Sequence, residues 1–372
     1  MPEQMVAQSS RLRPRSVRSG GAAFRCVILP RMGNQTSRRR GGAVTLKHVA
    51  ERAGVAPITV SRTLNAPESV SPALRAQIGD AVAALGYVPN RAAGMLASAR
   101  SRVVPVIVPS LSNAVFIEVI QGIQQELEAA GHQLLLGNTQ YDLARETELV
   151  STMLGWSPAG IIVAGLRHAP HTRTLLGQCG CPVVEIMELG GHPIDMNVGL
   201  SHFKAGAEMG RHLIGRGYRR IGFVGGRLGV DYRAMQRYRG LDRMLAEAGL
   251  PRRPPFTHEG RSSPATGGER LMATLAEAPE LDALFFANDD LAIGALLRAQ
   301  REGLAVPGRI AIAGFNGLGI GALTSPALTS IVSPRAEIGR LAAAKLLARA
   351  TGLPAGPARV DVGYSLAIRE ST

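Results

Sequence analysis

Cysteine, aromatic residues and long apolar runs are scarce in this chain of 372 residues. Cys26, Cys179 and Cys181 are too few for a disulfide framework, and this low usage is typical of a reducing compartment. No apolar run approaches the ~18 residues that a membrane-spanning helix needs, which argues against a membrane protein. Aromatic residues make up only 4% of the chain, so its core must consist mainly of Ala, Leu, Ile and Val. The apolar content of 45% is ordinary for a globular protein, and the length predicts two or three domains.

Positive charge is concentrated at one end of the chain. The net charge is +14, and residues 1–43 hold nine arginines against one acid, Glu3. Residues 44–102 carry seven lysines or arginines against three acids, whereas the rest of the chain is nearly neutral. A basic segment attached to a near-neutral body is typical of a protein with a small domain that faces nucleic acid.

Residues 1–43 show no lasting hydrophobic periodicity and are rich in Arg, Ser and Gly, so we expect a disordered basic extension. Two functional interpretations stay open for this extension: an arm that follows DNA phosphates, and an organellar transit peptide. The simplest alternative is a start codon assigned too far upstream, with Met32 as the true start. No apolar segment follows the basic residues as it would in a secretory signal, so we expect a cytoplasmic protein.

The pattern changes at Val44, where three short helices are predicted. Thr45 is placed to cap the first helix and Ser71 the third, because their hydroxyls can accept hydrogen bonds from free backbone N–H groups. Gly54 suits the positive φ of a tight turn, and Pro57 is tolerated in the first turn of the second helix. Two short helices around a glycine turn, braced by a third, form a helix-turn-helix unit. The expected helices are Leu46–Arg52, Ile58–Leu64 and Pro72–Leu85.

From Val103 onward, apolar runs of strand length alternate with amphipathic helical segments. This alternation predicts parallel sheets with helices on both faces, and its length favours two α/β lobes over one long sheet. Ligands of such folds bind beyond the carboxyl ends of the strands, so a cleft between the lobes is the expected site. The expected strands are Val103–Val108, Gln133–Gly137, Gly160–Val163, Pro182–Met187, Ile221–Val224, Ala283–Phe286 and Ile310–Phe315. The expected helices include Phe116–Ala130, Arg145–Leu154, Phe203–Gly215, Met235–Ala248, Asp289–Glu302 and Arg335–Ala350.

A proline interrupts the first of these strands. Pro105 lacks the N–H group that a central strand donates to its neighbour. We therefore expect this strand to begin at Val106 and to end before Pro109.

The stretch Val44–Asn65, VTLKHVAERAGVAPITVSRTLN, resembles the head of the LacI/GalR (lactose- and galactose-repressor) family. The resemblance extends to about residue 369. It implies a three-helix helix-turn-helix head and a hinge helix, followed by a two-lobed α/β core like that of periplasmic binding proteins. Further matching motifs are Val70–Ser71, Leu85–Arg91, Gly217–Tyr218, Ala287–Asp290, Val306–Pro307 and Ala313–Asn316. Three segments look most like the gluconate-operon repressor branch, namely Pro109–Phe116, Pro182–Glu185 and Asn288–Gly294.

The resemblance implies three parts of the chain. Residues 1–43 are the extension, residues 44–102 the DNA-binding head with its hinge helix, and residues 103–372 the core for effector binding and dimerisation. Within the core, lobe one is expected at about 103–200 plus 332–359, and lobe two at about 201–331 plus 360–372.

The resemblance also implies that the second helix lies in the DNA major groove. Arg62 is the long fork-shaped donor on that helix and can read guanine through two hydrogen bonds; the alternative is a solvated surface residue. Pro57 and Ile58 stand where relatives often carry polar base readers, so apolar contacts are expected to contribute to readout. Asn90–Ser98 resembles the hinge helix, whose Leu96 would wedge into a base step; the alternative is a flexible linker. The expected DNA-contacting residues are Leu46, Lys47, Pro57, Ile58, Thr59, Ser61, Arg62, Asn65, Ser71, Tyr87, Asn90, Ala93 and Leu96.

The core is expected to hold a small effector between its lobes. Arg237 can clamp a carboxylate, while Asn288 and Asn316 offer the donors and acceptors that polyol hydroxyls require. Ser262 stands where some relatives have an aromatic residue, which favours an anionic sugar acid over a sugar stacked on a ring. His168 is placed either at the rim of the site or in a solvated loop. The expected effector-binding residues, carried over from the family, are Asn113, Phe116, Tyr141, Glu185, Arg237, Ser262, Asn288 and Asn316.

No catalytic or metal-binding motif fits the sequence. The glycine-rich run Gly314–Gly321 does not match a dinucleotide-binding fingerprint, and Cys179-Gly-Cys181 has no second ligand pair, so buried thiols are favoured over zinc. A solute-binding transport protein would share the two-lobed body but lacks a DNA-binding head. We therefore expect a cytoplasmic, homodimeric repressor of sugar-acid catabolism without cofactor, metal or membrane contact, released from a pseudo-palindromic operator by its effector. Another sugar or a nucleoside is the alternative effector.

Overall fold

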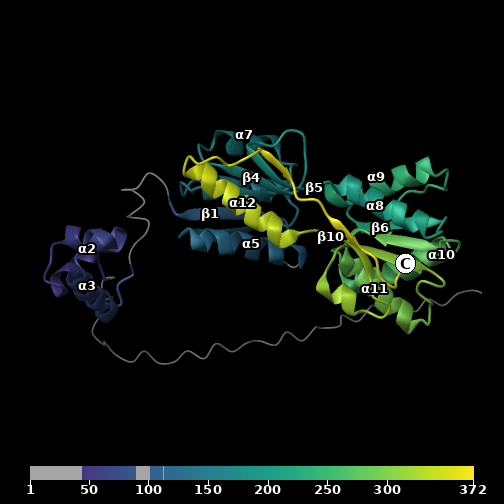
Figure 1. The fold of residues 1–372 in the computed structure, drawn as a ribbon, viewed down its shortest axis with the longest axis horizontal. Helices are drawn as coiled ribbons and strands as arrows, with labels where there is room; N and C mark the ends of the chain where they lie inside the picture. Colours follow the sequence, from purple (N-terminus) through teal and green to yellow (C-terminus); the bar gives the residue numbers. More distant parts are fainter. Residues whose placement is uncertain (1–43, 89–100, 112) are drawn as a thin grey trace, which may run out of the picture. The chain divides into compact units, whose positions relative to one another are not determined.

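The computed structural model describes residues 44–88, 101–111 and 113–372. By internal contacts the chain divides into two compact units, which meet in sequence between Asn90 and Arg91 (Figure 1). The expected hinge helix, Asn90–Ser98, and the N-terminal extension lie outside the described residues.

Unit one is a small helical bundle. It contains α1 (Leu46–Arg52), α2 (Pro57–Asn65), the 3-10 helix η1 (Pro67–Ser69) and α3 (Pro72–Leu85). The hydroxyl of Ser71 accepts a hydrogen bond from the backbone N–H of Leu74 at 3.4 Å and so caps α3. Gly86 ends α3 with a φ of 60°, which glycine adopts at little cost. The helices bury Val49, Val60 and Ile78 between them, which confirms the predicted helix-turn-helix head.

Unit two contains two α/β lobes. Lobe one consists of β1 (Val103–Val108), α5 (Val115–Ala129), β2 (Gln133–Asn138), α6 (Leu143–Leu154), β3 (Ile161–Ala164), α7 (Pro170–Gln178), β4 (Val183–Glu188), β5 (Met196–Leu200), α12 (Arg335–Ala350) and β11 (Arg359–Asp361). Lobe two consists of α8 (His202–Gly215), β6 (Ile221–Gly226), α9 (Tyr232–Glu247), β7 (Phe256–His258), α10 (Pro264–Glu277), β8 (Ala283–Phe286), α11 (Asp289–Arg301), β9 (Ala311–Asn316), the 3-10 helix η2 (Gly319–Leu323), β10 (Thr329–Val332) and β12 (Ser365–Ala367).

Within the described residues, each lobe has a sheet of six strands. The order is β11-β5-β4-β3-β1-β2 in lobe one and β12-β10-β9-β8-β6-β7 in lobe two. All pairs are parallel except β10 with β12. The seven expected strands are present with ends shifted by at most two residues, so the predicted fold class is confirmed. The strands that were not expected, β5, β7, β10, β11 and β12, are short.

The expectation that the first strand begins at Val106 was wrong. β1 starts at Val103 and includes Pro105, which lies opposite Leu135 of β2. The pairing of β1 with β3 begins only at Val106. Pro105 therefore precedes the ladder to β3, where its missing N–H is tolerated.

The chain passes between the lobes three times, after β5, after β10 and after β11. As a result α12 follows the elements of lobe two from α8 to β10 in sequence but packs against α5 in lobe one (Figure 1). One buried apolar cluster continues through both lobes and includes Val184 and Ile338 of lobe one and Phe315 and Ile331 of lobe two. This shared core holds the two lobes together at the crossings.

Helices α8 and α9 approach each other closely in lobe two. Gly206 of α8 lies against the backbone of Arg237, and Gly240 of α9 lies against the backbone of Phe203. A Cβ atom at either glycine would overlap those backbone atoms. The two glycines therefore set how near α9, which carries Arg237, lies to α8.

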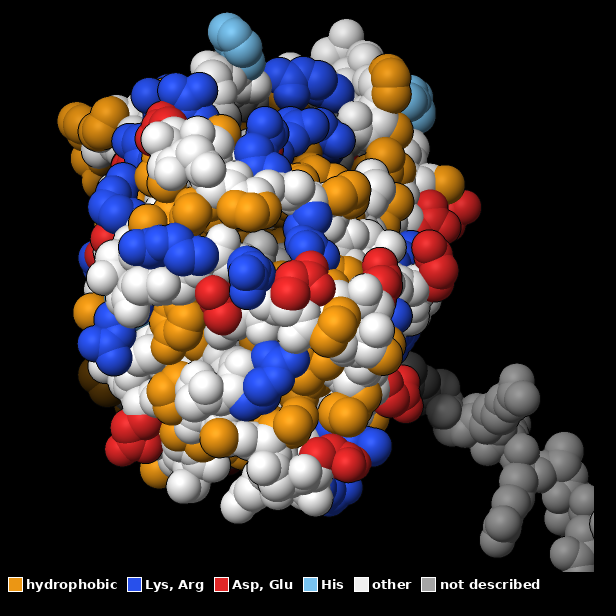
Figure 2. Space-filling view, turned by 90° about the vertical axis from the view of Figure 1, so that its right-hand side faces the viewer, with side chains coloured by type: hydrophobic (Ala, Val, Ile, Leu, Met, Phe, Trp, Pro, Cys, Tyr) orange, Lys and Arg blue, Asp and Glu red, His pale blue; other side chains and the backbone are white. Residues whose placement is uncertain are grey.

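Charged side chains on unit two are mixed in sign. Lys and Arg are interspersed with acidic and apolar side chains on the face that Figure 2 shows. Several arginines pair with a carboxylate one helical turn away, as in Arg243–Glu247 and Arg298–Glu302. No helix in the described part of the chain is long and apolar enough to cross a membrane.

Candidate functional site

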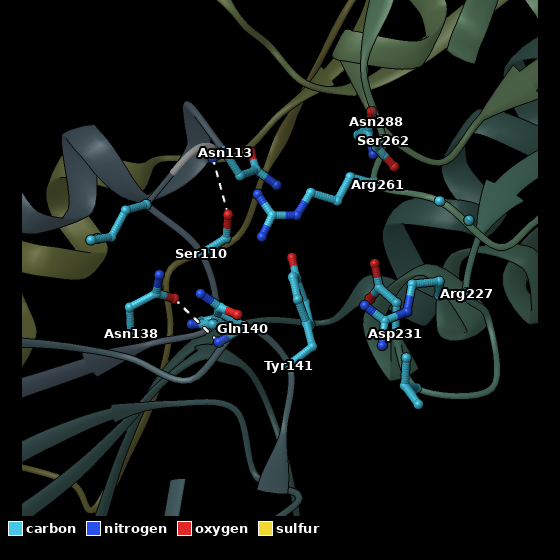
Figure 3. A pocket seen from close by; sticks show the side chains of 15 residues that line it. Ser110, Asn113, Asn138, Gln140, Tyr141, Arg227, Asp231, Arg261, Ser262 and Asn288 are labelled. Carbon is cyan, nitrogen blue, oxygen red and sulfur yellow. Dashed lines mark hydrogen bonds between the residues drawn. The ribbon is translucent and has the colours of Figure 1, made fainter. Parts of the chain in front are cut away.

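A cavity of unit two lies at the carboxyl ends of strands from both lobes. It has a volume of about 370 Å³. Loops after β1 and β2 form one wall, and loops after β6, β7 and β8 form the other (Figure 3). We call it the outer chamber; its lining is Pro109, Ser110, Leu111, Asn113, Asn138, Gln140, Tyr141, Gly226, Arg227, Val230, Asp231, Gly260, Arg261, Ser262 and Asn288.

A smaller cavity of about 40 Å³ shares four residues with the outer chamber, and we call it the inner chamber. The shared residues are Asn113, Tyr141, Asp231 and Asn288. The inner chamber adds Val115, Phe116, Met187, His202, Arg233, Arg237 and Asn316. It is therefore walled by residues of both lobes and contains two guanidinium groups.

The structure brings seven of the eight predicted effector residues to these chambers. Asn113, Tyr141 and Asn288 line both chambers. The other four divide between them, with Ser262 in the outer chamber and Phe116, Arg237 and Asn316 in the inner one.

Glu185 is the exception and lies in neither chamber. It is the third residue of β4, away from the carboxyl end of the strand, and it is fully buried. Its Oε2 accepts a hydrogen bond from the backbone N–H of Ile194 at 2.5 Å, and its Oε1 lies 3.3 Å from Nε2 of His168. Both oxygens of the Glu185 carboxylate therefore contact other residues of lobe one.

His168 lies neither at the rim of the chambers nor in a solvated loop. Its side chain is fully buried between Glu146 of α6 and Glu185 of β4, with Nδ1 2.8 Å from Oε1 of Glu146. Burial lowers the pKa of the ring, but the hydrogen bonds and charges of the two carboxylates outweigh burial and raise the pKa to about 9. His168 is therefore protonated at neutral pH and ties α6 to β4.

Arg237 is the most constrained charged group of the inner chamber. It is only 5% exposed, its Nη1 lies 2.9 Å from Nδ1 of His202, and its guanidinium stacks over the ring of Phe315 at 4.2 Å. Burial lowers its pKa to about 10, so it remains a cation at neutral pH. Among the described residues, no carboxylate lies within ion-pair distance of Arg237, and its Nε has no acceptor. The guanidinium can therefore take an anionic ligand.

Arg233 and Asp231 are site residues that sequence reasoning missed. Arg233 precedes Arg237 by four residues on α9, so both side chains lie on the same face of the helix. Burial lowers the pKa of Arg233, but the carboxylates of Glu188 and Asp231 outweigh it, and the pKa is raised overall. The Asp231 carboxylate also caps α9 by accepting the N–H of Ala234 at 3.0 Å. The spacing of the two arginines was the signal that could have found this pair.

Two asparagines point their amide groups into the site. Oδ1 of Asn113 accepts the backbone N–H of Val115 at 3.1 Å, and Oδ1 of Asn288 accepts that of Leu291 at 3.0 Å, where Asn288 caps α11. The Asn113 side chain also hydrogen-bonds the hydroxyl of Tyr141. Because each amide nitrogen carries two N–H groups, both asparagines can still donate to a ligand. Together with Arg237, they make the chambers rich in hydrogen-bond donors.

Asn316 connects the inner chamber to the crossing between the lobes. It ends β9 with a φ of 121°, a conformation that is uncommon for a residue other than glycine. Nη1 of Arg335 donates to its backbone carbonyl, while Nη2 of Arg335 donates to Oε1 of Glu118 at 2.7 Å. Arg335 thus joins β9 of lobe two to α5 of lobe one.

The predicted DNA-reading helix α2 presents a distinct outer face. Val60 and Thr63 are buried in the bundle, whereas Ile58 is 68% exposed and Arg62, one turn later, is also exposed. Pro57 and Lys47 are exposed as well, and Lys47 lies 3.9 Å from Glu51. An apolar side chain next to a guanidinium on one helix face can contact both thymine methyl groups and guanine edges.

The remaining residues that were predicted to contact DNA lie elsewhere in unit one or outside the described residues. Leu46 and Tyr87 pack on the bundle core, Thr59 and Ser61 are half-buried, and Ser71 caps α3. Asn90, Ala93 and Leu96, and the side chain of Asn65, lie outside the described part of the chain.

Each of the two units matches a known protein family. Residues 45–90 match the model for bacterial regulatory proteins of the lacI family, and residues 211–372 match the periplasmic binding protein-like domain. The chain is 41% identical over 323 residues to the HTH-type transcriptional regulator GntR of Escherichia coli, covering 86% of this chain and 96% of the relative. It is 35% identical over 329 residues to the HTH-type transcriptional regulator IdnR of the same organism, covering 88% and 98%.

A solved structure shows the same similarity in three dimensions. The crystal structure of a LacI-family transcriptional regulator from Silicibacter pomeroyi matches with a TM-score of 0.83 at 40% identity, covering 88% of this chain and 99% of that one. The predicted resemblance to the gluconate-operon repressor branch is confirmed by the GntR match. This protein therefore belongs to the lacI family of bacterial regulatory proteins and is a DNA-binding transcriptional regulator with an effector-binding domain, not an enzyme.

Proposed function

We propose that this protein represses genes of sugar-acid catabolism and that gluconate, or a closely related sugar acid, releases it from its operator. The observation that carries the proposal is Arg237, a buried cation with no carboxylate within ion-pair distance among the described residues. Asp231 and Glu188 act on this cation only from beyond ion-pair distance. A buried charge without a carboxylate in direct contact is costly, and a bound carboxylate would offset that cost.

The rest of the inner chamber supports the same ligand class. Phe116 offers an apolar surface, and the amide groups of Asn113 and Asn288 supply donors for hydroxyl oxygens. Arg233 adds a second cation, although Asp231 and Glu188 already balance its charge. A polyhydroxylated carboxylate meets these groups with acceptors at both its charged and its neutral end.

The proposed release depends on the connection between the two lobes. Residues of both lobes line the chambers, so a ligand that contacts both would favour one angle between them. We expect this change to alter the spacing of the paired segments around residues 90–98 in a dimer, and so to weaken their grip on DNA. The operator would be pseudo-palindromic because each subunit reads one half-site.

We infer that the protein acts as a cytoplasmic homodimer. Several large apolar side chains of lobe two remain exposed, with Leu297 at 46%, Ile320 at 60% and Leu323 at 83%. These residues come from α11 and η2, and we propose that they contribute to a contact between subunits. Sedimentation of the full chain across a concentration series tests this point, and a monomer at every concentration would contradict it.

Isothermal titration of the full-length protein with sodium gluconate tests the ligand. We expect a measurable heat of binding, and we expect Arg237→Gln to lose it. Arg239→Gln is the matched control, because Arg239 lies on the same helix but is exposed. D-Glucose has the same carbon chain without the carboxylate and should bind more weakly.

The same samples test release from DNA. The probe is a duplex that the protein itself selects from a random pool, and gluconate should lower its affinity for that duplex. No heat and no effect on DNA binding at millimolar gluconate would remove the sugar-acid assignment. A response to glucose or to a nucleoside instead would identify the alternative effector.

A further inference from the structure

Two cysteines come together at the end of α7. Cys179 follows the helix directly, and Gly180 then adopts a φ of 66°, which turns the chain back so that Cys181 faces Cys179. The two Sγ atoms lie 3.4 Å apart. The two sulfur atoms of a disulfide bond lie ~2.05 Å apart. Rotation of the two side chains would therefore have to bring the Sγ atoms only a little more than one ångström closer together.

The pair is accessible from solvent. Both cysteines are half-buried and Gly180 between them is exposed. Both cysteines also pack against the buried cluster that contains Val163, Leu176 and Val183, and Sγ of Cys179 contacts the carbonyl of Leu176 at 3.1 Å. Sequence reasoning expected buried thiols; the structure instead leaves them open to small reagents.

We propose that Cys179 and Cys181 form a dithiol modification site, which low-molecular-weight disulfides such as oxidised glutathione convert to a Cys179–Cys181 disulfide. The thiolate of Cys179 attacks one sulfur of the reagent, and the other sulfur leaves as a thiolate. Cys181 then loses its proton to water and attacks Sγ of Cys179, and the second reagent sulfur leaves as a thiolate. The protein loses two electrons and two thiol protons in all, and the reagent is reduced to two thiols.

The surroundings of Cys179 support the direction of attack. A hydrogen bond from the Cys181 thiol lowers the pKa of Cys179 to about 6, although burial and the Asp195 carboxylate raise it. Nη2 of Arg349 lies 3.1 Å from Oδ1 of Asp195, so the guanidinium partly neutralises that carboxylate. An ordinary cysteine has a pKa of ~8.5, so Cys179 is the better attacking group at neutral pH.

Peptide mapping of the full-length protein tests the proposal. Cys26→Ser removes the third cysteine of the chain and leaves the pair as the only thiols. After exposure to oxidised glutathione and quenching with iodoacetamide, trypsin releases the peptide Thr174–Lys204, which contains both cysteines. We expect this peptide to be unalkylated and lighter than its dithiol form by the mass of two hydrogen atoms, and dithiothreitol should reverse the change.

Two variants separate the steps. Cys181→Ser can still be attacked at Cys179 but cannot close the ring, so it should accumulate a stable glutathione adduct. Cys179→Ser should react far more slowly. Recovery of doubly alkylated peptide from the Cys26→Ser protein, or a persistent glutathione adduct on it, would overturn the proposal even if neither variant folds.

Discussion

The guanidinium of Arg237 donates a hydrogen bond to Nδ1 of His202 over 2.9 Å, and Nε2 of the same imidazole donates to the carbonyl of Met187 over 3.1 Å. Burial, followed by the charges of Arg237 and Arg233, lowers the pKa of His202 well below its ordinary value, so the ring stays neutral. His202 opens α8 in lobe two, while Met187 belongs to β4 in lobe one. The cation of the inner chamber is thus positioned by a neutral imidazole that also bonds across the lobes.

Replacing His202 should weaken binding of gluconate. His202→Leu removes the hydrogen bond that positions the guanidinium of Arg237 for the ligand. Loss of a hydrogen bond of this kind costs about 1–2 kcal/mol, or roughly tenfold in Kd. His202→Gln keeps an acceptor and should recover part of the affinity. Isothermal titration measures both, and an unchanged Kd in the leucine variant would show that the contact is not needed.

Gly206→Ala should displace the backbone that carries Arg237. The added Cβ would overlap the backbone carbonyl of Arg237, so α8 and α9 would have to move apart. We expect a loss of about 1–3 kcal/mol in the free energy of unfolding and weaker effector binding. Gly215→Ala, at the end of the same helix with no neighbour near its Cβ, is the control and should be neutral or stabilising. Urea unfolding monitors both variants; equal effects would refute the close approach.

His168 should make stability depend on pH above neutrality. Its pKa in the folded protein is about 9, against 6.5 in the unfolded chain, so its charge stabilises the fold fully below pH 6.5. That contribution, on the order of 3 kcal/mol, is lost as the pH rises through about 9. His168→Gln should flatten this part of the urea-unfolding profile and lower stability at neutral pH. If the free energy of unfolding of His168→Gln fell with pH as steeply as that of the unaltered protein, His168 would not be the titrating group.

The two partners of the Arg335–Glu118 ion pair should respond unequally to substitution. Arg335 is 4% exposed at its side chain, and its loss leaves the Asn316 carbonyl without this donor, so Arg335→Ala should cost about 1–3 kcal/mol. The Glu118 side chain is 46% exposed, and Glu118→Gln should cost less than about 1 kcal/mol. Chemical unfolding distinguishes the two; equal losses would mean that the ion pair itself carries the stability.

Arg62→Ala tests base readout by α2. If Arg62 reads guanine, the variant should lose roughly 1–3 kcal/mol on the selected duplex and keep its salt-dependent affinity for random DNA. Fluorescence anisotropy with both duplexes at two salt concentrations provides the comparison. An equal loss on random DNA would assign the side chain to phosphate contact.

The sequence predicted the parts of the fold that local patterns determine. Continuous apolar runs such as Ala283–Phe286 gave strands at the observed positions, because buried parallel strands need apolar side chains on both faces. β7 and β11 were missed because each has only three residues and depends on a neighbouring strand for its order. Pro105 misled the prediction, since only the register with β3 shows that its missing N–H is harmless there.

The site was predictable to a similar degree. Asn288 and Arg237, which were carried over from the family, both line the inner chamber, and the spacing of Arg233 and Arg237 could have added the second cation. Glu185 was misplaced because its position along β4, away from the carboxyl end, decides which groups it meets. His168 could not be interpreted locally, because its two carboxylate partners, Glu146 and Glu185, come from other elements and meet it only in the folded lobe.

The position of α12 has a consequence for how the protein is made on the ribosome. The bundle of unit one emerges early and can fold at once, because its helices contact partners that are close in sequence. Lobe one must wait, since the helix that packs against α5 is translated only after the part of lobe two from α8 to β10. During synthesis, the nascent chain therefore acquires its DNA-binding bundle long before it can respond to a metabolite.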